Sequence, residues 1–205
     1  MSEAKTATVV SVEALPGYLT LVAEASTGAL PGQWGAFWTD LPNPVKPGEV
    51  LKRAWSFAEI GEARFRLFVA TVGPGTEWLA TRRPGDGLKF TGPWGSRFRL
   101  DDGDGLAAFY AAGSGISPVG AMVDACVARG RPARLFWETA APAMHDRLER
   151  WRAAGVEVVV GSRLVPAGPG TWWFAGDGAR LDAVVGDAPP ERVERFHTPR
   201  PAVAA

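Results

Sequence analysis

The feature that most constrains this chain is a glycine-rich turn between a predicted buried strand and a predicted helix. The turn is Ala112-Gly113-Ser114-Gly115-Ile116-Ser117-Pro118, and the apolar run at 106–111 before it is typical of a buried strand. The helix is predicted from apolar residues at the i, i+3, i+4 spacing, namely Val119, Met122, Val123, Cys126 and Val127. We expect Ser117 to be the N-cap and Pro118 to lie in the first helical turn.

A turn of this kind can hold a phosphate. Glycines let the backbone come close to a ligand, and the N-terminus of the helix offers free N–H groups and the positive end of a dipole. The pattern is also found in tight turns that bind nothing, so it leaves both interpretations open.

A second motif, Arg53-Ala54-Trp55-Ser56, lies in a predicted strand at 51–57. Alternation along the strand would place Arg53 and Trp55 on one face, and Ala54 and Ser56 on the other. Together they could serve one long ligand, because a guanidinium binds phosphate, an aromatic covers a ring and a hydroxyl donates to a ring nitrogen. The alternative is a half-buried strand with one surface arginine.

Composition excludes several classes of protein. The 205 residues are 46% hydrophobic, which is enough for one large or two small cores. Because 22 lysines and arginines balance 22 aspartates and glutamates, no basic field for nucleic acid is expected. No apolar run approaches the ~20 residues of a membrane span, and the first residues lack the apolar core of a signal peptide. We predict a cytoplasmic protein without nucleic-acid or membrane partners.

The chain offers few residues for metal or nucleophilic chemistry. Its single cysteine, Cys126, excludes an intrachain disulfide or an all-cysteine cluster held by this chain alone, and it is expected to pack in the core. His145 falls off the apolar stripe of a helix predicted at 142–153, and His197 is close to the C-terminus. Neither belongs to a recognisable nucleophile motif or metal-ligand spacing. The chemistry is therefore expected to come from a bound cofactor.

An acidic, glycine-rich turn at 101–105 divides the chain into predicted domains at 1–100 and 101–205. Short alternating strands separated by Gly/Pro turns predict an antiparallel barrel in the first domain. They are expected at 6–12, 18–25, 34–39, 51–57, 64–72 and 87–90, with one short helix after Gly75. The second domain alternates strands at 106–111, 133–137, 156–160 and 171–175 with helices. A short helix at 179–185 and a last strand at 192–196 follow. This pattern predicts a parallel sheet that binds ligands at the carboxyl ends of its strands.

Five motifs follow one another in a diagnostic order. They are Pro31-Gly32-Gln33-Trp34, Arg53-Ala54-Trp55-Ser56, Gly75-Thr76-Glu77-Trp78-Leu79, Gly92-Pro93-Trp94-Gly95 and the turn at 112–118. Over residues 7–196, this order resembles the ferredoxin–NADP reductase-like flavoprotein superfamily. The resemblance implies a barrel that binds FAD, followed by an α/β domain that binds a nicotinamide nucleotide.

The resemblance also implies roles for the flavin motifs. Arg53 would hold the FAD pyrophosphate, and Trp55, where the family usually has tyrosine, would lie against the isoalloxazine. Ser56 would hydrogen-bond flavin N5 as the catalytic residue, beside the nicotinamide. Gly75 and Thr76 would bind the pyrophosphate through a backbone N–H and a hydroxyl. Ala54 completes the predicted cofactor-binding set.

In the second domain, the resemblance assigns the nucleotide phosphates to Gly113, Ser114 and Gly115, in a loop shaped by Ile116 and Pro118. Ala112 stands where the family usually has the first glycine, which removes some backbone freedom.

Three departures from the family pattern concern the nucleotide domain. Phe174-Ala175-Gly176-Asp177 replaces a segment that commonly reads Cys-Gly-Pro, and Asp177 is expected to cap a short helix instead. The link at 161–171 is short, so the domain looks trimmed. Glu138 follows the strand at 133–137 without an arginine beside it and suits ribose hydroxyls, which favours NADH. Arg163 could still reach the 2′-phosphate of NADPH.

The main hypothesis is an FAD-dependent NAD(P)H oxidoreductase that passes electrons to a separate redox partner protein or small acceptor. One alternative is an FAD-carrying electron-relay subunit of a complex, in which the trimmed domain no longer uses the nucleotide. A ferric-siderophore reductase is a further alternative, because Gly176-Asp177-Gly178-Ala179 loosely resembles a small-residue turn of that related family.

Overall fold

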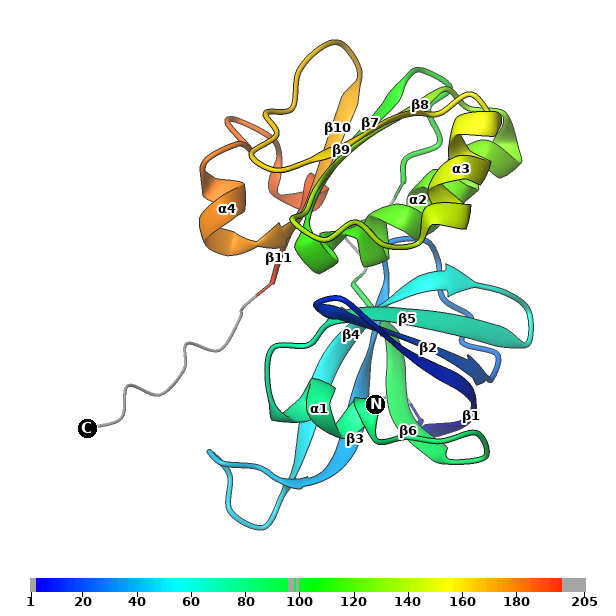
Figure 1. The fold of residues 1–205 in the computed structure, drawn as a ribbon, viewed down its shortest axis with the longest axis vertical. Coiled ribbons are helices and arrows are strands. Elements are labelled where there is room, and N and C mark those ends of the chain that lie inside the picture. The colour runs from blue at the N-terminus through cyan, green and yellow to red at the C-terminus, as the bar shows by residue number, and fades with distance from the viewer. Residues whose placement is uncertain (1–2, 96–97, 99, 197–205) are drawn as a thin grey trace.

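The fold was analysed in a computed structural model that describes residues 3–95, 98 and 100–196. A closed barrel of antiparallel strands is followed in the chain by a parallel sheet with helices, as Figure 1 shows. The predicted fold class, an antiparallel barrel followed by an α/β unit, is therefore confirmed.

The barrel has the strand order β1-β2-β5-β4-β3-β6. Its strands are β1 (Lys5–Leu15), β2 (Tyr18–Glu24), β3 (Trp34–Pro42), β4 (Val50–Ile60), β5 (Arg64–Ala70) and β6 (Gly87–Trp94), and helix α1 (Pro74–Ala80) follows β5. Inward-facing aromatic residues fill the barrel, because alternate residues of each strand point to its interior. Phe37 contacts Phe57, Phe65 and Phe90, with ring centroids 5.1–6.2 Å apart.

The second unit is a five-stranded parallel sheet in the order β11-β10-β7-β8-β9. The strands are β7 (Ala107–Ala112), β8 (Ala133–Glu138), β9 (Glu157–Gly161), β10 (Thr171–Asp177) and β11 (Val193–Phe196). Its helices are α2 (Ile116–Arg129), α3 (His145–Ala153) and α4 (Gly178–Asp182), with 3₁₀ turns at Gly113–Gly115 and Pro190–Arg192. Every residue of β7 is buried, as the continuous apolar run of a central parallel strand predicts.

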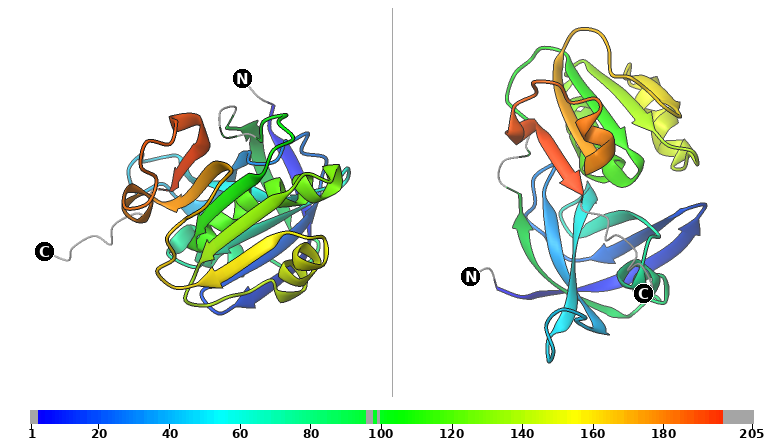
Figure 2. Two further views of the ribbon diagram at one scale, coloured as in Figure 1. Left: turned by 90° about the horizontal axis from the view of Figure 1, so that it is seen from above. Right: turned by 90° about the vertical axis from the view of Figure 1, so that its left-hand side faces the viewer.

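The two units share a hydrophobic core. Residues of α2 and α3 pack in one cluster with Trp137 of β8 and with Tyr18 and Phe68 of the barrel. Tyr18 stacks on Phe68 at 4.7 Å between ring centroids. Helix α4 belongs to a separate cluster with Tyr110 and Phe174. The right-hand view of Figure 2 likewise shows the parallel sheet above the barrel.

Some details differ from the sequence predictions. Helix α2 begins at Ile116, so Ser117 lies inside the first turn and is not the N-cap; its hydroxyl donates instead to the Phe68 carbonyl. Val127 is exposed rather than packed, because it lies at the outer edge of the apolar stripe. Helix α3 begins at His145, which is exposed as expected, and Cys126 is buried in the core. His197 lies outside the described residues.

No helix in the described part of the chain is both long and apolar enough to cross a bilayer.

Candidate active site

Three of the five motifs lie on neighbouring barrel strands. Trp34, in the first motif, pairs with Ser56 on one side and with Trp94 on the other. The Phe57 N–H donates to the Gln33 carbonyl at 3.1 Å, which fixes the first two motifs side by side. Segments up to about 60 residues apart in the sequence therefore meet at one place on the barrel.

A fourth motif, which begins at Gly75, contacts strand β4 through the side chain of Arg53. A Cβ placed on Gly75 would lie 2.7 Å from Arg53 Cγ and 3.1 Å from Nε, so the arginine side chain rests directly on the glycine. Gly75 is buried, and Arg53 keeps part of its surface exposed. The predicted phosphate-binding arginine thus lies beside the predicted pyrophosphate turn.

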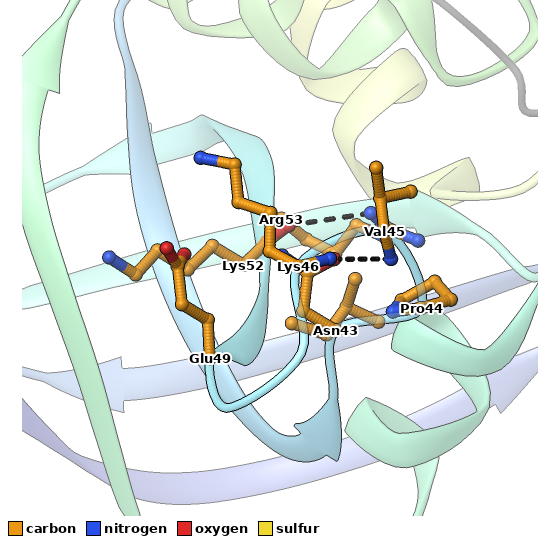
Figure 3. Close-up of a pocket in the computed structure, with 8 residues that line it drawn as sticks. Asn43, Pro44, Val45, Lys46, Glu49, Lys52 and Arg53 are labelled. Carbon is orange, nitrogen blue, oxygen red and sulfur yellow. Dashed lines mark hydrogen bonds between the residues drawn. The ribbon is translucent and has the colours of Figure 1, made fainter.

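Arg53 also lines a surface depression at the β3–β4 hairpin, shown in Figure 3. Lys46 and Lys52 line it as well, and no ion pair joins either lysine to an acidic residue in the described chain. Asn43 Oδ1 accepts from the backbone N–H groups of Val45 and Lys46 at 3.0 and 3.2 Å and shapes the hairpin. Glu49 lines the depression too, so its three basic side chains and one acidic side chain leave a net positive charge, which suits a phosphate group.

The Thr76 hydroxyl, which is predicted to bind the pyrophosphate, has hydrogen-bond partners within its own turn. Its hydroxyl donates to the Gly73 carbonyl at 2.9 Å and accepts from the N–H groups of Val72 and Gly73 at 3.1 and 3.3 Å. These bonds close the start of α1, so the hydroxyl organises the turn and is already engaged within the protein.

Trp55 and Ser56 are both buried, with 6% and 9% of their surfaces exposed. The Trp55 ring packs inside the barrel, 5.3 Å from the Phe37 ring centroid, whereas Ala54 is exposed. A more accessible aromatic lies on the other side of Trp34 from Ser56: Trp94 is 39% exposed and its ring is 6.5 Å from that of Trp34. The sequence analysis predicted flavin contact for Trp55 alone. The position of Trp94 in the Gly-Pro-Trp-Gly motif could have indicated it as a second candidate.

The glycine-rich loop is held firmly between the sheet and the barrel. Gly113 has a φ of +54°, a conformation that favours glycine, and its carbonyl accepts from Trp137 Nε1 at 2.9 Å. A Cβ on Gly115 would lie 2.0 Å from the Ala175 carbonyl oxygen, so no side chain fits there. Ile116 and Pro118 are buried, and Ser114 keeps part of its surface exposed. The loop thus presents Gly113 and Ser114 and packs on β10 through Gly115.

Glu138, at the end of β8, is engaged by two neighbours. Arg180 donates to both of its carboxylate oxygens at 2.6 Å, and Tyr110 donates to Oε2 at 3.0 Å. Burial alone would raise the pKa of Glu138, but the hydrogen bonds from Arg180 and Tyr110 lower it overall. Burial and the bond to Glu138 raise the pKa of Tyr110 to about 12. The Glu138 carboxylate, which is predicted to bind the ribose hydroxyls, is therefore already engaged by Arg180 and Tyr110. The sequence analysis did not identify Arg180 as a residue of this site.

Two further carboxylates lie near the end of β10, one on that strand and one on the neighbouring strand β11. Asp177 accepts from the Ala179 N–H at 3.1 Å and caps α4, as predicted. Glu194 of β11 lies in register with Ala175, where the family commonly has cysteine, and burial raises its pKa. Its place beside Ala175 was not predicted, because a lone glutamate in a short strand gives no sequence signal.

Metal and thiol chemistry gain no support from this geometry. The described residues contain no group of three or more His, Cys, Asp or Glu side chains placed to hold a metal ion. Burial raises the pKa of Cys126 to about 11, which keeps the thiol protonated and unreactive at neutral pH.

Comparisons with known proteins agree with the fold. No family model matches the chain. It is 37% identical over 103 residues to ferredoxin–NADP reductase B of Sorangium cellulosum, covering 48% of this chain and 42% of that protein. It is 31% identical over 86 residues to the electron transfer subunit of dihydroorotate dehydrogenase B (NAD⁺) of Clostridium acetobutylicum, covering 37% and 35%. The matches thus span less than half of these relatives.

Solved structures match nearly the whole chain. The Amycolatopsis cytochrome P450 reductase GcoB has a TM-score of 0.76 at 20% identity, covering 95% of this chain and 70% of that one. The flavohem-like FAD/NAD-binding domain of nitric oxide dioxygenase from Vibrio cholerae has a TM-score of 0.75 at 15% identity, covering 94% and 97%. In its two-domain fold, and in sequence over about half of its length, the chain resembles the ferredoxin–NADP reductase-like flavoprotein superfamily, as its motifs predict.

Proposed function

We propose that this chain is an FAD-dependent oxidoreductase that takes electrons from NADH or NADPH and passes them to a separate acceptor. In this proposal, residues 1–100 bind FAD and residues 101–205 bind the nicotinamide nucleotide. The observation that carries the proposal is the packing of β4, which bears Arg53 and Ser56, against α2, which begins directly after the glycine-rich loop. This packing supports two adjoining cofactor sites in the proposal.

Each chain segment has a task in this proposal. Arg53, supported by Gly75, holds the pyrophosphate of FAD, and Ser56 places its hydroxyl at N5. Gly113 and Ser114 hold the nucleotide phosphates, and burial at the shared interface excludes water from the reacting atoms. Bound FAD supplies the chemistry of accepting a hydride and releasing electrons singly or in pairs. We propose a partner protein or a diffusible compound as the acceptor, in keeping with the likeness to a ferredoxin–NADP reductase and to an electron transfer subunit.

The preference for NADH rested on an available Glu138 carboxylate. Because Arg180 and Tyr110 engage its oxygens, that argument no longer distinguishes the two nucleotides. Arg163, exposed after β9, remains a candidate for the 2′-phosphate of NADPH. We therefore propose either NADH or NADPH as the co-substrate.

The test begins with the purified protein reconstituted with FAD. We expect a yellow protein that oxidises NADH or NADPH with ferricyanide as the acceptor. Arg53→Ala should weaken FAD binding ten- to a hundredfold, since loss of a charge-assisted contact costs about 1.5–3 kcal/mol. Arg83→Ala, which replaces an exposed arginine of the loop between α1 and β6, is the matched control. A colourless protein that takes up no FAD would overturn the proposal.

A relay subunit is the second candidate. It is supported by Ala175 at the usual cysteine position, by the short link at 161–171 and by the likeness to an electron transfer subunit. In this case FAD binds, and a chemical reductant or a reduced partner reduces it, but neither nucleotide does. Both candidates place the protein in the cytoplasm, which stays a prediction.

A further inference from the structure

We propose that Arg147 is a positioning residue that locks the nucleotide-binding helix α2 to the flavin strand β4. The proposal rests on the proposed function, because it concerns how the two candidate cofactor sites are held in register. Arg147 belongs to α3 and to none of the five motifs.

Arg147 is buried between three elements. Only 4% of its side chain is exposed. Its Nη2 donates to the Ala58 carbonyl of β4 and to Asp124 Oδ2 of α2, both at 2.6 Å. Its Nε lies 3.6 Å from Glu59 Oε1, again in β4. One guanidinium thus joins α3, α2 and the barrel through short, charge-assisted contacts.

The space around the guanidinium is shaped for it. A Cβ on Gly120 would lie 3.1 Å from both Nη1 and Nη2, so the glycine leaves room for the planar group against α2. Trp151 covers it, with Arg147 Cζ 4.8 Å from the ring centroid, and donates through Nε1 to Asp124 at 2.6 Å. Gly120 and Trp151 thus hold the planar guanidinium against α2.

The contacts of Arg147 affect the distance between the two candidate cofactor sites, at Ser56 and at the glycine-rich loop. Ala58 lies two residues beyond Ser56 on β4, and Asp124 lies in the helix that starts after the glycine-rich loop. Arg147 therefore fixes the loop relative to the strand that bears Ser56. Hydride transfer depends steeply on such placement, since a shift of about 1 Å can cost on the order of a hundredfold in rate.

The first test measures flavin reduction by stopped flow with saturating NADH or NADPH. Arg147→Met should lower the limiting rate at least tenfold while FAD binding stays within about twofold. Arg150→Met, an exposed arginine one turn along the same helix, should leave both unchanged. Gly120→Ala keeps the charge, displaces the guanidinium and should lower the limiting rate in the same direction, so the proposal stays testable if Arg147→Met folds poorly.

The second test is amide hydrogen exchange of the FAD-loaded protein. Loss of the lock should speed exchange in both β4 and α2 for Arg147→Met and Gly120→Ala, but not for Arg150→Met. If the nucleotides fail to reduce wild type, the proposed function fails, and this exchange pattern still decides whether Arg147 couples the two elements. Unchanged limiting rates in both variants, or exchange no faster than in Arg150→Met, would overturn the positioning role.

Discussion

The side chain of Arg53 lies directly on Gly75, where a Cβ would come 2.7 Å from Arg53 Cγ. The contact joins β4 to the start of α1 and brings the candidate phosphate-binding arginine onto the candidate pyrophosphate turn. The conformation of Arg53 thus depends on the absence of a side chain at residue 75.

Gly75→Ala should therefore displace Arg53 and weaken FAD binding about tenfold, since part of a charge-assisted phosphate contact is lost. Fluorescence quenching of FAD on titration measures the affinity. Gly105→Ala adds a methyl group into open space and serves as the control. Equal affinities for wild type and Gly75→Ala would show that Arg53 does not need its observed position to bind FAD.

Ser56→Ala should retain FAD but slow its reduction by the nucleotide. Removing one donor positioned at a reacting atom costs about ten- to a thousandfold in rate. Ser56 is buried and pairs with Trp34. The alanine variant lacks only the hydroxyl oxygen, so it should disturb the packing little. Stopped-flow bleaching of the flavin band measures the rate, and a rate equal to that of wild type would count against the assigned role.

Glu138→Gln should destabilise the fold by about 1–2 kcal/mol at pH 7, because it breaks the paired contacts from Arg180. The pKa of Glu138 is lowered in the folded protein, so its contribution is present above the ordinary carboxyl range and is lost as pH falls through the folded-state pKa. The difference between wild type and Glu138→Gln in urea unfolding should therefore shrink in acid. Glu149→Gln, on the exposed face of α3, is the control, and a gap that widens in acid would refute the account.

Glu194→Gln should stabilise the fold at pH 7, whereas Glu138→Gln should destabilise it. Burial raises the pKa of Glu194, so the folded state holds its proton more tightly than the unfolded chain, and stability falls as pH rises above the unfolded-state pKa. The glutamine variant should raise the melting temperature by about 1–3 °C at pH 7, and the gain should disappear near pH 4. A melting temperature at pH 7 equal to or below that of wild type would contradict this placement of the carboxylate.

Local patterns predicted the elements well. Alternation and Gly/Pro turns indicated the six barrel strands, and the apolar run at 106–111 indicated the central strand of the parallel sheet. Helix starts were harder to place. The short 3₁₀ turn ahead of α2 and the left-handed Met144 ahead of α3, with a φ of 58°, have no simple residue signal.

The missed contacts are those between distant segments. Glu138 meets Arg180 across 42 residues, and Arg147 meets Ala58 across 89, so neither pairing has a local pattern. Thr76 is the opposite case. Its motif was recognised from the sequence, but the bond of its hydroxyl to the Gly73 carbonyl within the same turn was not predicted. Short motifs thus located the candidate site, whereas the packing of the two units decided which polar atoms remain available.

Anaerobic mixing of the FAD-loaded protein with NADH or NADPH tests the central claim most directly. The account predicts that at least one nucleotide bleaches the flavin band within seconds and that an added electron acceptor restores it. If neither nucleotide bleaches the band while dithionite does, the chain binds FAD without accepting electrons from a nicotinamide, and the oxidoreductase proposal is contradicted.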